Sequence, residues 1–157
     1  MSIIAIDPGI TTGMVVIERH AIYPYSATTT EELARYLQWH TGDGLTGIAL
    51  IENFIGGGYR TAEAVGTLKT LGFVEYYLRY MSSYPHPTVV LRAPQLRKPY
   101  VQTAKRILDS FAQDYTVHTA DALAHVISYM KENPEIEHRY RSSPLRRLLE
   151  LPAEQEA

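Results

Sequence analysis

Two short apolar runs that each end in an acidic residue constrain the fold of this chain most strongly. Ser2–Ile6 is followed by Asp7, and Gly47–Ile51 is followed by Glu52. Runs of this length predict buried strands. Residues 28–32, three threonines and two glutamates, lie between them and predict a helix start with an N-cap hydroxyl and first-turn acids. If the two strands are parallel neighbours, both carboxylates emerge at one edge of a sheet, where charge is unfavourable unless a cation arrives.

The remaining pattern is typical of an α/β domain. Further strands are predicted at Met14–Glu18, Ala21–Tyr25 and Thr88–Leu91, and further helices at Thr61–Tyr80, from Pro94 through Phe111, and at Thr119–Lys131. Because strands come first and then alternate with helices, we expect a mixed β-sheet of about five strands flanked by α-helices. We expect this domain to span residues 1–133. A polar, arginine-bearing tail then covers residues 134–157, with a candidate short helix at 144–151.

The composition fits one globular domain. The 157 residues are 45% hydrophobic and 20% charged, and none is a cysteine, which excludes disulfide frameworks, thiolate nucleophiles and cysteine-based zinc sites. No apolar run approaches the roughly 18 residues of a membrane span, and no basic segment precedes the first strand. We therefore expect a soluble, cytoplasmic protein with no membrane partner.

The net charge of −2 conceals an asymmetry along the chain. Residues 1–91 carry five Lys or Arg against eight Asp or Glu, whereas residues 92–106 carry five cations and no acid. Residues 138–147 add four arginines and again no acid. This distribution is compatible with a phosphate-binding surface in the second half of the chain, and equally with a solvated charged face.

A third acid, Asp121, falls in the first turn of the last predicted helix, three residues after His118. This spacing places both side chains on one helical face. Together with Asp7 and Glu52 they form a set of oxygen and nitrogen ligands suited to Mg²⁺, and a pair of such ions can promote phosphodiester hydrolysis. Taken singly, each acid is equally an ordinary turn, surface or helix-terminus carboxylate.

Three segments carry a family resemblance. IIAIDPGITTGMVVI, IALIENF and HTADALAHVISY resemble, in the same order, the acidic motifs of the RuvC-type Holliday junction resolvases of the RNase H-like superfamily. The resemblance implies that Asp7, Glu52 and Asp121 are catalytic metal ligands and that His118 is a fourth ligand or a proton-transfer group. The segment RKPYVQTAKRIL is similar to the one that carries a catalytic lysine in the family, which implies that role for Lys98.

The resemblance also implies a function. The chain would be a metal-dependent, structure-selective DNA endonuclease that resolves four-way junctions or related branched DNA by paired phosphodiester hydrolysis. It would act as a homodimer with two Mg²⁺ ions per active site, for which Mn²⁺ would substitute. Its place in the cell would be the cytoplasm, at the nucleoid in a bacterium or in the host cytoplasm for a virus.

Seven further residues are predicted to contact DNA. Phe54, Tyr59 and Arg60 belong to the glycine-rich loop that follows Glu52, where an aromatic ring can stack on an exposed base. The cations predicted to contact phosphate, besides Arg60, are Arg92, Arg97, Lys105 and Arg106.

Two alternatives stay open. Residues 7–12, with the pattern Asp-x-Gly-x-Thr-Thr, also resemble the phosphate-binding turn of actin-like ATPases and sugar kinases, which would make the chain a nucleotide-binding domain. The chain could also be a non-catalytic branched-DNA-binding protein on the same fold.

Overall fold

The computed structural model describes residues 1–44, 46–53, 61–110 and 114–140, and its centre is one five-stranded sheet. The strands lie in the order β3-β2-β1-β4-β5. They are β1 Ser2–Asp7, β2 Thr12–Ile17, β3 Ile22–Ala27, β4 Thr46–Glu52 and β5 Thr88–Arg92. β4 runs parallel to β1 and to β5, whereas β2 is antiparallel to β1 and to β3. The predicted mixed sheet is confirmed, and the strands that end in Asp7 and Glu52 are parallel neighbours.

The first four helices follow the predicted segments, except that the third begins later, and the fifth was not predicted. They are α1 Thr30–Thr41, α2 Ala62–Tyr76, which continues as a π-helical turn over Tyr77–Met81, α3 Val101–Ser110, α4 Val117–Glu132 and α5 Pro134–Arg139. The helix predicted from Pro94 begins only at Val101, after two 3₁₀ turns that each have a proline in their first positions. Proline lacks the N–H donor that a continuing α-helix needs. Within the described residues no helix has both the length and the apolar character to cross a membrane.

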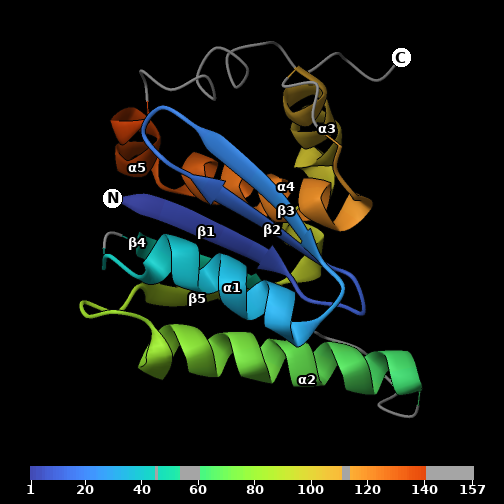
Figure 1. The fold of residues 1–157 in the computed structure, drawn as a ribbon. Coiled ribbons are helices and arrows are strands. Elements are labelled where there is room, and N and C mark those ends of the chain that lie inside the picture. The colour runs from blue at the N-terminus through green and yellow to red at the C-terminus, as the bar shows by residue number, and fades with distance from the viewer. Residues whose placement is uncertain (45, 54–60, 111–113, 141–157) are drawn as a thin grey trace.

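The helices cover both faces of the sheet (Figure 1). Side chains alternate along a strand, so Ile4 and Ile6 of β1 pack with α1 and α2, while Ile3 and Ala5 pack with α3 and α4. Asp7 follows Ile3 and Ala5 at the same spacing, so its side chain lies on the side of α3 and α4. By the same alternation Glu52 follows Leu50, which packs on the α4 side. Both strand-end carboxylates therefore lie on the face that α4 covers.

The amino-terminal end of α4 is tied closely to the sheet. Thr119 donates a hydrogen bond from Oγ1 to the Tyr25 carbonyl of β3 (3.1 Å), and its N–H donates to the N-cap hydroxyl of Thr116 (3.3 Å). On β2, a Cβ at Gly13 would overlap the backbone of His118. Only glycine allows the backbone of β2 to lie this close to the first turn of α4, which brings His118 and Asp121 near the ends of the strands.

The folded part of the chain extends past the boundary predicted at residue 133. Asn133 and Pro134 end α4, but proline is well suited to a first helical position, and α5 starts there. Ile136 and Tyr140 are buried in the core, and the Tyr140 hydroxyl donates to the Met1 carbonyl (2.9 Å). The candidate helix at 144–151 lies outside the described residues.

Candidate active site

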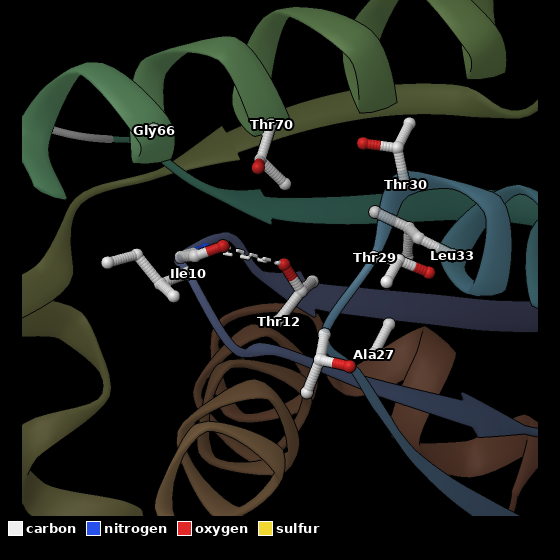
Figure 2. Close-up of a pocket in the computed structure, with 10 residues that line it drawn as sticks. Ile10, Thr12, Ala27, Thr29, Thr30, Leu33, Gly66 and Thr70 are labelled. Atoms are coloured by element: carbon white, nitrogen blue, oxygen red, sulfur yellow. Dashed lines mark hydrogen bonds between the residues drawn. The ribbon is translucent and has the colours of Figure 1, made fainter. Parts of the chain in front are cut away.

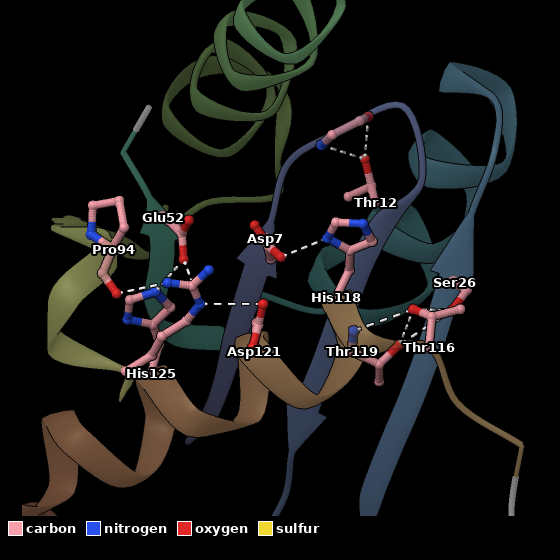
Figure 3. Close-up of polar contacts among 12 residues, drawn as sticks. Asp7, Thr12, Ser26, Glu52, Pro94, Thr116, His118, Thr119, Asp121 and His125 are labelled. Carbon is pink, nitrogen blue, oxygen red and sulfur yellow. Dashed lines mark hydrogen bonds and ion pairs between the residues drawn. The ribbon is translucent and has the colours of Figure 1, made fainter. Parts of the chain in front are cut away.

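The three predicted acids meet in one cleft. Asp7 and Glu52 come from the ends of β1 and β4, and Asp121 comes from the second turn of α4 (Figure 3). The cleft has a volume of about 390 Å³, and its walls also include His118 and Arg97. The other lining residues are Pro8, Gly9, Ile10, Thr11, Glu63 and Thr67. Sheet order and the position of α4 thus bring together residues that are more than 100 positions apart.

On one side of the cleft lies a group that we call the open triad: Asp7, His118 and Asp121. Each can offer one ligand atom such that all three atoms lie within 4.8 Å of one another. His118 Nδ1 is 2.8 Å from Asp7 Oδ2, and the imidazole is partly exposed to the cleft. Two carboxylates and an imidazole within this span fit a divalent cation such as Mg²⁺ or Mn²⁺.

Asp7 has an unusual protonation equilibrium. Burial, and after it the negative charge of Glu52, raise the pKa of its carboxyl group from 3.8 to about 6. The hydrogen bond and the charge of His118 act in the opposite direction but are smaller effects. Asp7 therefore carries an energetic cost when it is ionised, and a bound cation would relieve that cost.

The other side of the cleft is already paired internally, and we call Glu52, Arg97 and His125 the paired side. His125 Nε2 donates to Glu52 Oε2 (2.8 Å), and Arg97 Nε lies 3.2 Å from the same oxygen. Arg97 Nε is also 3.2 Å from Asp121 Oδ2, and Nη1 of Arg97 donates to the Pro94 carbonyl (2.7 Å). Glu52 is thus held by a guanidinium and an imidazole, and it does not belong to the close ligand group of the open triad.

The structure separates the predicted cations. Arg97, predicted as a phosphate contact, faces the carboxylates. Lys98 is exposed on the next 3₁₀ turn, and its catalytic role stays a prediction. Lys105 and Arg106 lie half-buried on α3, where Arg106 donates to the Thr103 hydroxyl (3.4 Å).

Arg92, predicted to contact DNA phosphate, is engaged within the protein. It is only 6% exposed, and its guanidinium donates two hydrogen bonds to Glu132 (2.9 and 2.7 Å) and one to Ser128 (3.0 Å). These contacts also lower the pKa of Glu132. Arg92 joins the end of β5 to α4 and so supports the sheet edge beside the cleft. Phe54, Tyr59 and Arg60, the other predicted DNA contacts, lie outside the described residues.

Two residues of the site were not predicted from the sequence. Glu63 reaches the cleft from α2, and no local pattern marks it. His125 does have a signal, because it follows Asp121 by four residues and His118 by seven, on the same face of α4. Its imidazole is 1% exposed and contacts Glu52, so it acts on a predicted ligand from inside the core.

A smaller pocket of about 100 Å³ lies beside the β1–β2 turn and is lined by Gly9, Thr12 and the start of α1 (Figure 2). The N–H of Gly9 donates to Thr12 Oγ1 (3.4 Å). Ligand pockets usually measure about 300–1,000 Å³, and here a turn N–H that would face a phosphate is engaged internally. Both observations count against a nucleotide in this smaller pocket.

The sequence matches no protein-family model and no curated protein, whereas the structure is similar to solved structures. T. thermophilus RuvC in complex with Holliday junction substrate superposes with a TM-score of 0.54 and 18% identity, over 85% of this chain and 97% of that chain. Fowlpox virus resolvase in complex with substrate Holliday junction DNA gives a TM-score of 0.51 and 14% identity, over 84% of this chain and 98% of that chain. This chain has the RNase H-like fold of these two proteins.

The alignments span nearly the whole of both neighbouring structures. They confirm the fold predicted from the acidic motifs. At 18% and 14% identity this likeness shows the fold alone.

Proposed function

We propose that this protein is a metal-dependent endonuclease that resolves Holliday junctions or related branched DNA. The observation that carries the proposal is the meeting of Asp7, Glu52 and Asp121 in one cleft, at the ends of two parallel strands and the start of α4. Both structural neighbours are described with Holliday junction DNA as substrate. A carboxylate cleft on this fold is suited to phosphodiester hydrolysis when it holds a divalent cation.

Asp7, His118 and Asp121 would hold the cation, with Glu52 available for a second one. When bound, Mg²⁺ would activate the attacking water and stabilise charge on the phosphate and on the leaving 3′ oxygen. The chain itself fixes the ligands: His118 orients Asp7 through the 2.8 Å contact, and His125 orients Glu52. The rigid ends of β1, β4 and α4 keep these groups in place before DNA arrives.

The cations near the cleft would bind the DNA backbone. Lys98 lies next to Arg97 in the chain, and its exposed ammonium is available to a phosphate that enters the cleft. Lys105 and Arg106 follow on α3. A charge close to the scissile phosphate stabilises the transition state, whereas a more distant cation contributes to affinity alone.

We also propose that the active species is a homodimer, because symmetric cutting of a four-way junction needs two equivalent sites. The outward face of α2 supports this proposal. Val65, Tyr76 and Tyr80 are exposed by 39%, 58% and 66%, on one side of α2 and the turn that continues it. Gly72, between them, has no neighbouring atom within 4 Å of where a Cβ would lie. Such a surface suits close packing against a second copy.

The test is cleavage of a synthetic four-way junction. The purified protein should cut it in two strands with Mg²⁺ or Mn²⁺ and not with EDTA, and it should leave a linear duplex of the same sequence largely intact. Asp121→Asn is the matched control and should bind the junction without cutting it. Junction binding with no cleavage under any divalent cation would indicate the non-catalytic alternative, and ATP hydrolysis would indicate the nucleotide-binding one.

A further inference from the structure

Arg97 sits where the cleft would otherwise need a cation. Its Nε faces Glu52 Oε2 and Asp121 Oδ2 at equal distances of 3.2 Å. The guanidinium stays charged at every accessible pH, so it offsets the repulsion between these two carboxylates continuously. The hydrogen bond from Nη1 to the Pro94 carbonyl (2.7 Å) holds the side chain in this place.

The carboxylates hold Arg97 by charge attraction and not by well-directed hydrogen bonds. Within the described residues, Arg97 Nε is a buried donor with no acceptor in line with its N–H, although both oxygens are near. Its side chain is 21% exposed at the wall of an open cleft. Arg92 is the contrast inside this molecule, since two well-directed bonds join it to Glu132. Arg97 is therefore the more easily displaced of the two guanidinium groups.

A divalent ion between Glu52 and Asp121 would need the oxygens that Arg97 faces. Mg²⁺ binds carboxylate oxygens at about 2.0–2.1 Å, which leaves no room for a guanidinium nitrogen in contact with both of them. The two cations would also repel each other. Asp121 belongs to both sides, since its Oδ2 faces Arg97 while the residue is also part of the open triad. The ion pairs of Arg97 do not extend to Asp7 or His118. An ion held by these two residues and the other carboxylate oxygen of Asp121 would not require the same displacement.

We propose that Arg97 is an internal counter-ion that occupies the second divalent-cation position until DNA arrives. A DNA phosphate offers the guanidinium a bidentate acceptor, draws it away from Glu52 and Asp121, and so lets a second ion bind between them. The inference rests on the proposed function. Because coupling between two ligands is reciprocal, the second ion and the DNA would each strengthen the binding of the other.

The test counts ions in the DNA-free protein. Mn²⁺ binding to the full chain is followed by the EPR signal of free Mn²⁺ for the wild type, Arg97→Gln and Lys98→Gln. The wild type should bind one ion tightly. Arg97→Gln should bind two, with the second at least about tenfold tighter than any second ion in the wild type, a conservative value for the removal of one charge so near. Lys98→Gln removes a neighbouring charge without contact to the carboxylates and should behave as the wild type does.

Arg97→Gln with the same ion number and affinities as the wild type, or with weaker binding, would overturn the proposal. If this variant is unfolded without metal, refolding by millimolar Mn²⁺ with two ions bound supports the proposal, and failure to refold overturns it. Cleavage of the junction by the wild type is scored separately. A wild type that binds one ion and cuts nothing would sink the proposed function alone, whereas a cutting enzyme with unchanged ion counts in Arg97→Gln would sink only the role of Arg97.

Discussion

The two sides of the cleft solve the same electrostatic problem in different ways. In the open triad, Asp7 is buried next to other acids, and this environment raises the pKa of its carboxyl group to about 6. On the paired side, Glu52 is compensated by Arg97 and His125. One side is left for a cation from solution, and the other side already holds a cation from the chain.

The difference shows that a cluster of carboxylates is not by itself a uniform metal site. Asp7, His118 and Asp121 present ligand atoms within 4.8 Å of one another, whereas Glu52 Oε2 is shared between two donors of the protein. We therefore expect the two sides to respond differently to mutation, to pH and to metal, although both serve one reaction.

The largest effects are expected for the carboxylates. Asp7→Asn, Asp121→Asn and Glu52→Gln should each lower the rate of junction cleavage by about 10³-fold or more, because each removes several kcal/mol of transition-state stabilisation by metal. Mn²⁺ binding without DNA should distinguish the two sides. Asp7→Asn and Asp121→Asn should lose Mn²⁺ binding, whereas Glu52→Gln should retain it. Circular dichroism and junction binding in EDTA provide the controls. Equal loss of Mn²⁺ in all three variants would erase the distinction between the two sides.

The second prediction concerns stability against pH. The folded protein holds a proton on Asp7 more tightly than the unfolded chain does, since its pKa rises from 3.8 to about 6. Stability due to this group therefore falls as the pH rises from about 4 to 6, by about 3 kcal/mol in total, and remains lower above that range. Asp7→Asn removes this cost.

Urea unfolding without metal measures this effect. Asp7→Asn should be more stable than the wild type at pH 7.5 by about 3 kcal/mol and nearly equal to it at pH 4. Saturating Mg²⁺ should remove most of the advantage, because the ion stabilises the ionised wild type. An advantage of Asp7→Asn that is independent of pH would show that burial of charge is not its source.

Much of this arrangement was predictable from the sequence, because it depends on local patterns. The apolar runs before Asp7 and Glu52 predict two buried strands, and the structure supplies the condition that these strands are parallel neighbours. The motif around Asp121 defines the third acid. Alternation along β1 and β4 then places both strand-end acids on one face. These signals are short-range, and the topology converts them into a site.

The pairing of Glu52 was not predictable in the same way. Arg97 and Lys98 are adjacent cations in the sequence, and the register of two 3₁₀ turns decides which of them faces the cleft. Arg92 carries the same charge as Arg97 but lies at the end of β5, where its guanidinium donates two hydrogen bonds to Glu132. Tertiary contacts decide which of these cations stays available for DNA, and a count of Lys and Arg residues cannot distinguish them.

A moderate effect is expected for His125, which contacts Glu52 from the core. His125→Phe keeps the ring but removes the donor to Glu52, and we expect cleavage to fall by about 10–100-fold, as for other residues that orient metal ligands. His125→Gln keeps an N–H donor and should recover most of the rate. Single-turnover rates at saturating junction measure both variants. A folded His125→Phe that cuts at the wild-type rate would show that Arg97 alone is enough to orient Glu52.

The smallest effect on activity is expected for His118→Asp. A carboxylate at this position still offers an oxygen ligand beside Asp7 and Asp121, so cleavage at saturating Mg²⁺ should stay within a few-fold of the wild type. Without metal, however, the imidazole that donates to Asp7 Oδ2 is replaced by a third negative charge. This repulsion should raise the pKa of Asp7 further and lower the melting temperature of the metal-free protein at neutral pH.

Titration with Mg²⁺ resolves the two effects of this substitution. His118→Asp should need more Mg²⁺ than the wild type near pH 6, where protons compete for the carboxylates, and should equal or exceed its affinity near pH 8, where an additional anionic ligand attracts the ion. His118→Ala serves as the control, since it removes the ligand without adding charge and should bind Mg²⁺ more weakly at both pH values. If His118→Ala cuts well and His118→Asp is inactive at saturating Mg²⁺, residue 118 is not a ligand, and the open triad reduces to two carboxylates.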